Sequence, residues 1–440
     1  MKAVTFSGGI HPRYEKDRTA GLAVKPLPDS DEVVVPLSQH IGAPASACVE
    51  KGDEVLRGQA VGEPGGFVST FIHSPVSGKV KAIEPRPGMG GAPVQSVVIS
   101  SDGENREAEF EGLGTDWESA DADALKELVR KGGLVGMGGA AFPTHVKLSP
   151  PKEKPIDAVI LNGAECEPFL TSDHRVMLER PDDVITGLAI VQKVLGASKA
   201  IIGIEQNKPD AIEAITKAAQ GKNVEVFSLE VKYPQGAEKQ LIDACLGRQI
   251  PSGGLPMDVG VVVQNVGTAA AIADAVILGK PLIERIVTVT GPAIEDPSNL
   301  LIKVGTPVNK VIEACGGVKD DIGKLISGGP MMGMAQYTDE VPVTKGTSGL
   351  LFLTKDDVDV DDPGPCIRCG RCVRACPMRL PPTEIATYSA KTMIEEAEES
   401  GALDCIECGS CSFECPSHIT LVQHIRLGKA AIMAAKRKKN

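Results

Sequence analysis

Eight of the twelve cysteines in this 440-residue chain occur in two copies of one pattern. Residues 366–377 read CIRCGRCVRACP and residues 405–416 read CIECGSCSFECP. Both copies have the spacing C-x2-C-x2-C-x3-C-P, which is typical of thiolates that bind iron–sulfur clusters. Zinc sites usually combine two ligand pairs, and disulfide frameworks belong to small secreted chains. The pattern therefore predicts two 4Fe–4S clusters, which transfer single electrons.

The same spacing predicts which cysteines share a cluster. It resembles the cysteine run of bacterial ferredoxins, in which three cysteines of one run bind one cluster and the fourth binds the other. The expected ligands are Cys366, Cys369, Cys372 and Cys415 for cluster 1, and Cys405, Cys408, Cys411 and Cys376 for cluster 2.

A glycine-rich stretch upstream, GLVGMGGAAFPTHVKL at residues 133–148, is the second candidate for chemistry. Glycine lets backbone amides approach an anionic phosphate closely. The stretch lacks the strand–GxGxxG–helix context and does not match the P-loop pattern. Its composition alone therefore leaves two interpretations, a flexible loop or a phosphate-binding loop.

Composition and charge limit the remaining possibilities. The chain length predicts two to four domains. A net charge of −12 argues against nucleic acid as the main partner. The N-terminus has no apolar core of signal length, and the most apolar window, residues 259–279, is interpreted as a strand and a helix. We expect a soluble or peripheral protein in a reducing compartment.

The elements that must position these residues begin with a small β domain. Residues 1–110 contain short β-branched runs and resemble biotinyl/lipoyl-type barrel-sandwich modules. The hairpin that would present a carrier lysine reads GEPGGFVST and has none, so we expect the fold without the modification. Turn or packing roles are expected for His11 and His73.

Strand–helix alternation follows. The pattern predicts a helix at 121–132, a buried strand at 156–168 that ends in polar residues, further strands, and helices at 183–195, 209–220 and 268–278. This alternation is typical of a three-layer α/β domain with a largely parallel sheet. Such sheets bind ligands at the carboxyl ends of their strands.

Residues 125–280 resemble the flavoprotein subunit of respiratory complex I. Five blocks agree in order, including NGAECEP, DHRVMLERPDDVITGLAI, YPQGAEKQL and VVVQNVGTAAAIADA. The family's glycine-loop pattern, G-x-G-G-A-x-F-P-T-x-x-K, is matched by Gly136, Gly138, Gly139, Ala140, Phe142, Pro143, Thr144 and Lys147.

This resemblance implies site residues. The glycine loop and Lys147 would bind the FMN phosphate, and Phe142 would stack on the adenine of NADH. Two family acids are replaced by Ala164 and Ala237, which removes negative charge near the dinucleotide and leaves the choice between NADH and NADPH open. The remaining residues expected to line the flavin and nicotinamide pocket are Asn162, Glu165, Glu167, Tyr233, Gly236, Glu238 and Asn265.

The whole chain resembles the RnfC family, the NADH-binding subunits of Rnf ferredoxin:NAD+ oxidoreductases. The implied fold is α/β and multidomain: an unmodified barrel-sandwich module, a Rossmann-like FMN/NADH domain, a β-grasp domain and a helical dicluster ferredoxin domain. The expected boundaries are 1–115, 116–282, 283–355 and 356–440. Within the last domain we expect an acidic linker at 356–362 and one helix at 383–402. A C-terminal amphipathic helix would cap the clusters or dock to a partner or membrane.

The resemblance implies electron transfer from NADH to FMN, then to the two clusters and a partner. The chain would be a peripheral subunit on the cytoplasmic face of the membrane, with integral and ferredoxin-like partner subunits that contain the Na+ or H+ path. One alternative is a soluble reductase such as cobalamin reductase, in which the β-grasp domain would follow the clusters. The other is an electron-transfer subunit without a working flavin site.

Charge differs between the two cysteine runs. The first run contains three arginines at 368, 371 and 374, whereas the second contains Glu407 and Glu414. Positive charge stabilises a reduced cluster, so the sequence predicts different reduction potentials for the two clusters.

Overall fold

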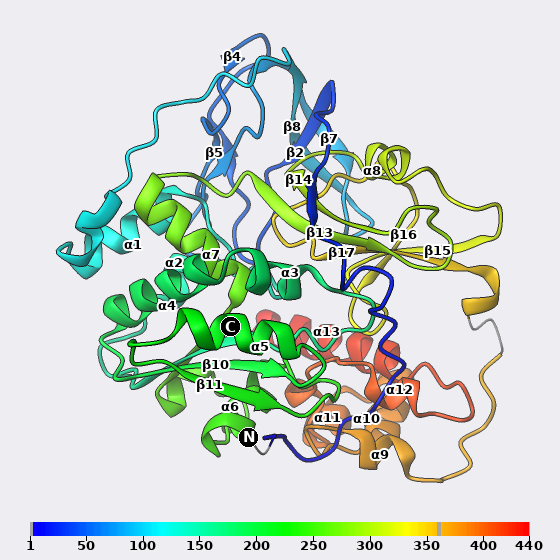
Figure 1. The fold of residues 1–440 in the computed structure, drawn as a ribbon. Helices are drawn as coiled ribbons and strands as arrows, with labels where there is room; N and C mark the ends of the chain where they lie inside the picture. Colours follow the sequence, from blue (N-terminus) through cyan, green and yellow to red (C-terminus); the bar gives the residue numbers. More distant parts are fainter. Residues whose placement is uncertain (1–2, 359–361, 440) are drawn as a thin grey trace.

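Two small antiparallel sheets form the N-terminal module in the computed structural model, which describes residues 3–358 and 362–439 (Figure 1). Their facing side chains, among them Val33, Val61, Ile72 and Ile99, are fully buried. The predicted barrel-sandwich fold is confirmed. In sheet order the strands are β2 (Glu32–Pro36), β8 (Pro93–Ser101), β7 (Gly78–Pro87) and β4 (Glu54–Val55), and then β3 (Ser46–Ala47), β5 (Ala60–Glu63) and β6 (Ile72–His73).

A parallel four-stranded sheet is the centre of the next domain. Its strands, in sheet order, are β11 (Glu225–Leu229), β10 (Lys199–Glu205), β9 (Ala158–Gly163) and β12 (Val261–Asn265). The helices around it are α1 (Ala122–Lys131), α2 (Thr144–Lys147), α3 (Ser172–Glu179), α4 (Pro181–Leu195), α5 (Pro209–Ala218), α6 (Glu238–Leu246) and α7 (Val266–Ala273). The predicted three-layer arrangement is therefore correct.

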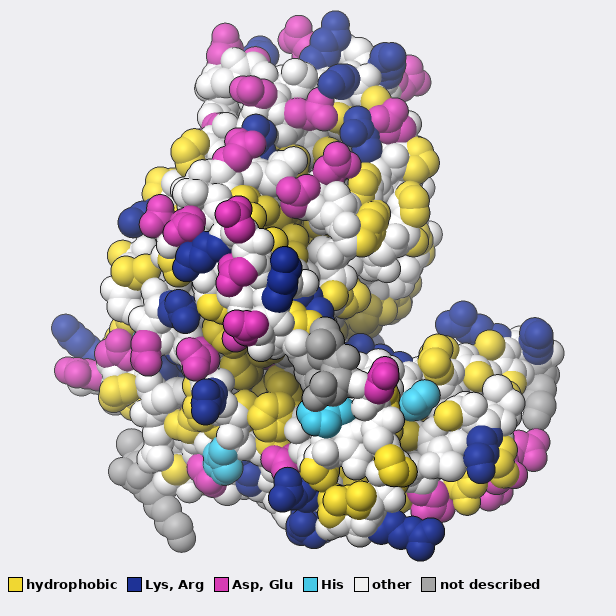
Figure 2. Space-filling view, turned by 90° about the vertical axis from the view of Figure 1, so that its right-hand side faces the viewer, with side chains coloured by type: hydrophobic (Ala, Val, Ile, Leu, Met, Phe, Trp, Pro, Cys, Tyr) yellow, Lys and Arg dark blue, Asp and Glu magenta, His cyan; other side chains and the backbone are white. Residues whose placement is uncertain are grey.

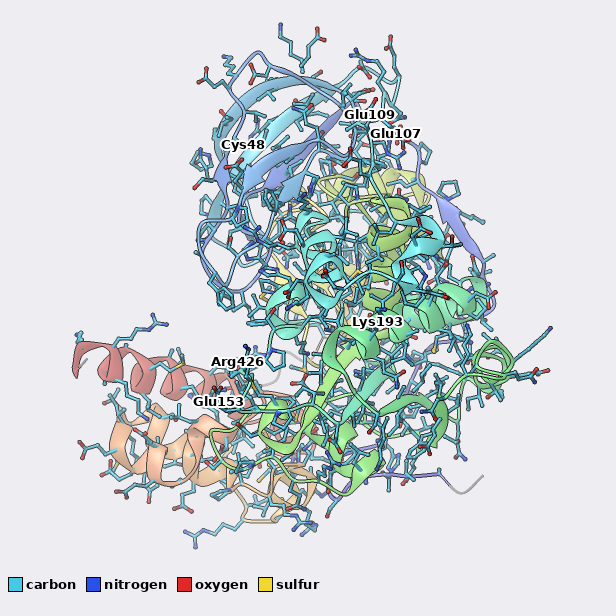
Figure 3. All side chains as sticks on the ribbon, turned by 90° about the vertical axis from the view of Figure 1, so that its left-hand side faces the viewer. Cys48, Glu107, Glu109, Glu153, Lys193 and Arg426 are labelled. Carbon is cyan, nitrogen blue, oxygen red and sulfur yellow. The ribbon has the colours of Figure 1, made fainter. Side chains whose placement is uncertain are left out.

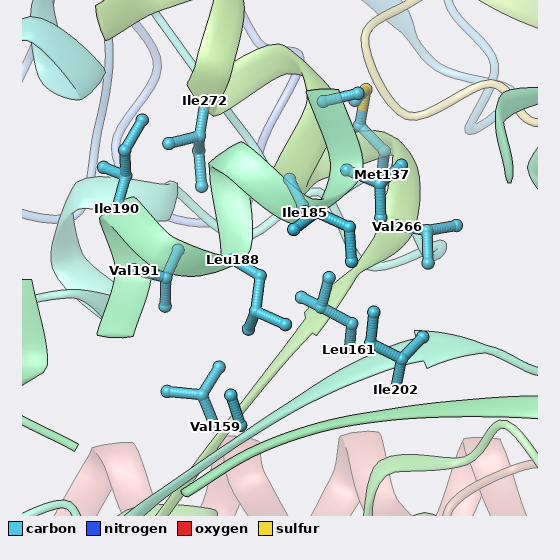
Figure 4. Packing of buried hydrophobic residues seen from close by; sticks show 14 of the residues in the cluster. Met137, Val159, Leu161, Ile185, Leu188, Ile190, Val191, Ile202, Val266 and Ile272 are labelled. Atoms are coloured by element: carbon cyan, nitrogen blue, oxygen red, sulfur yellow. The ribbon is translucent and has the colours of Figure 1, made fainter. Parts of the chain in front are cut away.

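Alternation along β9 explains the layers. Val159 and Leu161 point to the face covered by α4 and α7, where they pack against Leu188 (Figure 4), whereas Ala158 and Ile160 point to α6. A strand with helices on both faces must be apolar throughout. Helix α4 begins with a proline and two aspartates and ends at a left-handed glycine, so its own sequence defines its bounds.

A six-stranded mixed sheet lies beside these two domains. Its order is β1 (Val24–Pro26), β14 (Ser298–Lys303), β13 (Glu284–Thr290), β17 (Gly349–Thr354), β15 (Ile322–Ser327) and β16 (Met334–Gln336), with helix α8 (Val308–Ala314). Strand β1 comes from the N-terminal segment and pairs in parallel with β14. A segment near the N-terminus therefore completes a sheet whose other strands lie more than 250 residues later.

The C-terminal region is helical and projects from the rest of the molecule, as Figures 2 and 3 show from opposite sides. It contains α9 (Arg371–Ala375), α10 (Pro382–Ala390), α11 (Ile394–Glu399), α12 (Ser410–Phe413) and α13 (Leu421–Lys439). Helix α13 packs on α10 and α11, so it caps this region. The middle of the predicted acidic linker, residues 359–361, lies outside the described residues.

The single helix expected at 383–402 is wrong. The chain turns at Thr392, which has a φ of 56° in the left-handed region, and helices α10 and α11 lie on either side of it. Breaking the helix lets both pieces contact α13. Among the described residues, no helix is both long and apolar enough to cross a bilayer.

Candidate functional site

Polar residues gather at the carboxyl edge of the parallel sheet. Asn162 is the next-to-last residue of β9 and Asn265 is the last residue of β12, and the two are register partners. The Asn265 oxygen accepts hydrogen bonds from Gly267 and Thr268 at the start of α7, at 2.8 and 3.2 Å, so it caps that helix. A Cβ on Gly138 would lie 3.5 Å from the Asn265 side chain. The structure thus brings together predicted residues from three separate segments.

The glycine loop is closed at its base and open at its tip. The Gly136 amide donates to the carbonyl of the half-buried Phe142 at 2.8 Å, and the Met137 amide donates to the Thr268 hydroxyl at 2.9 Å. Residues 138–140 are exposed, and a Cβ on Gly139 would meet nothing within 4 Å. Exposed backbone amides without side chains around them are what phosphate binding requires.

Two more predicted residues contact each other at this edge. The Lys147 ammonium donates to the Glu238 carboxylate at 2.8 Å and to the Val263 carbonyl at 2.7 Å. Its side chain is 31% exposed, so a bound anion can still reach it. A lysine held this way presents a fixed positive charge beside the glycine loop.

Gly236 lies against Asn162. The Asn162 amide nitrogen donates to the Gly236 carbonyl at 2.8 Å, and its oxygen accepts from Ala164 at 3.1 Å. A Cβ on Gly236 would lie 3.2 Å from the Asn162 side chain and 3.4 Å from the Ala164 methyl group. Gly236 therefore packs closely on Asn162 and Ala164, and a larger side chain at this position would push them aside.

The two glutamates bind protein amides. The buried Glu165 carboxylate accepts from the Asp173 and His174 amides at 2.6 and 3.2 Å and so caps the start of α3. The Glu167 carboxylate accepts from Met331 and Met332 at 3.1 and 2.8 Å, in the loop after β15. Burial raises the pKa of Glu167 to about 7. Glu165 therefore links the loop after β9 to α3, and Glu167 links the same loop to the loop after β15.

Two buried lysines, which no sequence pattern indicates, bind the loop between these glutamates. The Lys16 ammonium donates to the carbonyls of Glu165 and Glu167 at 2.8 and 2.9 Å. The Lys208 ammonium donates to the Ala164 carbonyl at 2.6 Å. Neither lysine has a local sequence signal, because each acts on a loop more than 40 residues away.

Tyr233 connects this edge to the cysteine runs. Its side chain is 1% exposed, and its hydroxyl donates to the Cys408 carbonyl at 2.7 Å. Ile10, Cys166 and Ala375 pack around the same contact. The N-terminal segment also takes part, because the Gly9 amide donates to the Ala375 carbonyl at 2.9 Å.

The two cysteine runs share one backbone conformation. Arg368 and Glu407, at equivalent positions, have φ values of 56° and 58°, and Gly370 and Gly409 have φ values of 70° and 79°. Each glycine directly precedes a short helix, α9 or α12. The repeated sequence therefore forms a repeated loop.

The ligands expected for the second cluster line one cavity. It has an empty volume of about 370 Å³, partly open to solvent, and its wall includes Cys376, Cys405, Cys408 and Cys411 together with apolar side chains such as Ile385 and Ile425. Burial raises the pKa of the Cys405 thiol to about 11 and that of Cys411 to about 12. Thiolates there need the positive charge of bound metal, so the donor set fits a 4Fe–4S cluster.

The cysteines expected for the first cluster lie nearer the surface. Cys366 and Cys369 are exposed, Cys415 is half-buried and Cys372 is buried. Among the described residues, no three cysteine, histidine or acidic side chains could bind a single metal ion. A four-iron cluster separates its thiolates more widely than one ion does.

The charge difference between the runs is smaller than the sequence predicts. Glu407 forms ion pairs with Arg426 and Lys429 of α13 at 2.9 and 2.6 Å. Figure 3 shows Arg426 at the end of that helix next to the parallel-sheet domain. The Lys429 ammonium also donates to the Cys405 carbonyl at 2.8 Å. Positive charge from the helix that follows the second run thus offsets the acid within it.

Comparisons with known proteins identify the family of each region of the chain. The chain matches the families described as RnfC barrel sandwich hybrid domain (4–104), Nuo51 FMN-binding domain (129–274), SLBB domain (286–335) and 4Fe-4S dicluster domain (358–416). A subunit of the Na(+)-translocating ferredoxin:NAD(+) oxidoreductase complex of Acetobacterium woodii is 52% identical, with 100% of both chains covered. Its counterpart in the proton-translocating complex of Clostridium ljungdahlii is 50% identical over 98% of this chain and 94% of that one.

A solved structure shares the fold. A chain in the crystal structure of an NAD+-reducing NiFe hydrogenase in the air-oxidized state superposes with a TM-score of 0.50 and 18% identity. The match covers 74% of this chain and 70% of that chain.

Proposed function

The chain belongs to the RnfC family of subunits of ion-translocating ferredoxin:NAD+ oxidoreductase complexes, and from this we propose that it transfers electrons between NAD(H) and a ferredoxin-type partner. It combines an FMN-binding domain with a dicluster domain. The single observation that carries the proposal is the contact between these two domains, in which Tyr233 hydrogen-bonds the Cys408 loop.

The chain's own residues define where FMN would bind. The exposed amides of residues 138–140 and the Lys147 ammonium would bind its phosphate, while Asn162, Gly236 and Asn265 would leave space for the ring at the sheet edge. When bound, FMN supplies the exchange between a two-electron hydride donor and one-electron carriers. The protein's own task is to position the reactants.

The two cluster sites have different surroundings, which suggests the order in which electrons pass through the two clusters. The second ligand set is the less exposed one and adjoins the FMN-binding domain through Tyr233 and Gln240, whose amide donates to the Pro377 carbonyl at 3.3 Å. Cys366 and Cys369 of the first set are exposed. We place the second cluster next to the flavin and the first cluster next to the electron partner.

The partners follow from family membership. We propose that integral membrane and ferredoxin-like subunits bind this chain at the cytoplasmic face of the membrane and contain the ion path. The β-grasp domain expected at 283–355, within which residues 286–335 match the SLBB family, precedes the cluster runs. This order favours an Rnf-type subunit over a soluble cobalamin reductase, in which we expect the opposite order.

Analysis of the anaerobically purified protein tests the function. We expect roughly eight irons per chain, one FMN, and reduction of ferricyanide by NADH. Iron-loaded protein without NADH:ferricyanide activity, even with added FMN, would mean that the chain only relays electrons. Co-purification with integral membrane subunits distinguishes an Rnf-type subunit from a soluble reductase.

The cluster order has its own test. Cys408→Ser and Cys369→Ser each remove one ligand from a different set. If the second cluster adjoins the flavin, NADH should still reduce the remaining cluster in Cys369→Ser but not in Cys408→Ser, as followed by freeze-quench EPR. Both variants should keep NADH:ferricyanide activity. The opposite pattern would reverse the order.

A further inference from the structure

The hairpin between β5 and β6 has no role in the function described so far. In biotinyl/lipoyl modules this segment presents a carrier lysine, but here its tip presents Phe67. The Phe67 side chain is 71% exposed, the largest exposure of any large apolar side chain among the described residues. An aromatic ring left in water contributes little to folding, so its position suggests a contact with a ligand.

The hairpin tip is rigid. The Ala43 amide donates to the Val68 carbonyl at 2.9 Å, and the Gly65 amide donates to the Ser69 hydroxyl at 3.1 Å. Gly42 has a φ of +109°, and a Cβ there would lie 1.9 Å from the Val68 carbonyl oxygen, so only glycine allows this approach. The backbone that carries Phe67 is therefore held in one place before any ligand arrives.

Backbone contacts place the tip beside the glycine loop. The Ala43 amide, which donates to the Val68 carbonyl of the hairpin, is two residues from Ile41. The Ile41 amide donates to the Ala141 carbonyl at 3.3 Å.

A buried lysine secures the base of the same hairpin. The Lys345 ammonium donates to the Phe71 carbonyl at 2.8 Å and to the Gly133 carbonyl at 2.7 Å, and so links the hairpin to the start of the glycine-rich stretch. In Figure 1 the N-terminal module lies over the region of α1 and α2. Ile41, which is 52% exposed, and Phe67 thus belong to two hydrogen-bonded loops of the N-terminal module that contact the glycine-rich stretch.

We propose that Phe67 stacks on the adenine base of NAD(H) bound at the glycine loop, as a second aromatic contact besides the one expected from Phe142. The inference rests on the proposed function and adds a binding residue from a second domain. Aromatic side chains stack on bases with useful affinity and tolerate water at their edges. A flat apolar face next to a loop suited to phosphate matches the adenosine half of a dinucleotide, which joins a flat base to a pyrophosphate.

Binding of ADP-ribose and of nicotinamide mononucleotide separates the two halves of the ligand. In the iron-loaded protein, Phe67→Ala should weaken ADP-ribose binding, measured by calorimetry, roughly fivefold or more. The KM for NADH should rise by a similar factor, while oxidation of reduced nicotinamide mononucleotide should not change. Phe67→Trp should restore ADP-ribose binding. Tyr337→Ala, which removes a 63% exposed aromatic from the β-grasp domain, is the matched control.

Three other results would contradict the inference, and each has a different meaning. Equal ADP-ribose affinity in Phe67→Ala and the wild type would exclude stacking, and weaker co-purification with membrane subunits in that case would assign Phe67 to a partner contact. An equal loss for both half-ligands would mean a general disturbance of the site. If the wild type binds neither NADH nor ADP-ribose, the proposed function is wrong as well.

Discussion

Removing the Tyr233 hydroxyl tests the junction between the FMN-binding domain and the cluster domain. Tyr233→Phe keeps the ring, which is 1% exposed, but deletes the donor that lies 2.7 Å from the Cys408 carbonyl oxygen. A buried acceptor left without its partner costs about 1–3 kcal/mol. Because every 1.4 kcal/mol is a factor of ten, the opened junction should become roughly five- to 150-fold more populated.

Hydrogen exchange of the amides at residues 405–411 measures this opening directly in the iron-loaded protein. We expect faster exchange there and slower reduction of the clusters by NADH, with unchanged NADH:ferricyanide activity. Tyr14→Phe is the matched control, because its hydroxyl donates to the Val231 carbonyl at 3.1 Å and does not touch the cluster domain. If both variants exchange alike at residues 405–411, Tyr233 does not hold the junction.

Three further predictions concern the site and its supports. Gly42→Ala should lower the thermal unfolding midpoint much more than Gly52→Ala, because both glycines have φ above +100° but only the first would clash with backbone. The positive φ strains an alanine at either position by about 1–2 kcal/mol. Burial lowers the pKa of Lys345 to about 7, so between pH 7 and 10.5 the unfolded chain binds a proton that the folded chain does not. The free energy of unfolding should therefore rise with pH across this window, by at most about 1.4 kcal/mol per unit, and denaturant titrations of Lys345→Met should lack the rise. Asn265→Ala should lose about 1–2 kcal/mol of helix capping and retain less FMN after gel filtration.

The sequence alone was sufficient for the chemistry of the cysteine runs and for the type of each domain. Ligand spacing is a local property, because the first three cysteines of each run must reach one cluster whatever surrounds them. The apolar run of β9 and the proline and glycine at the ends of α4 are local in the same sense. Periodicity failed at Thr392, where contact with α13 favours two short helices over one long helix.

The tertiary structure decided which of these local features meet. Tyr233 reaches Cys408 across 175 positions, and Lys345 links two segments more than 200 positions away. Contacts of this kind depend on how whole domains pack, and they leave no repeating pattern in the sequence nearby. The sequence by itself therefore determined which cysteines can bind the electron carriers, whereas the fold decided that the less exposed cysteine set adjoins the FMN-binding domain and that Ile41 of the N-terminal module contacts the glycine-rich stretch.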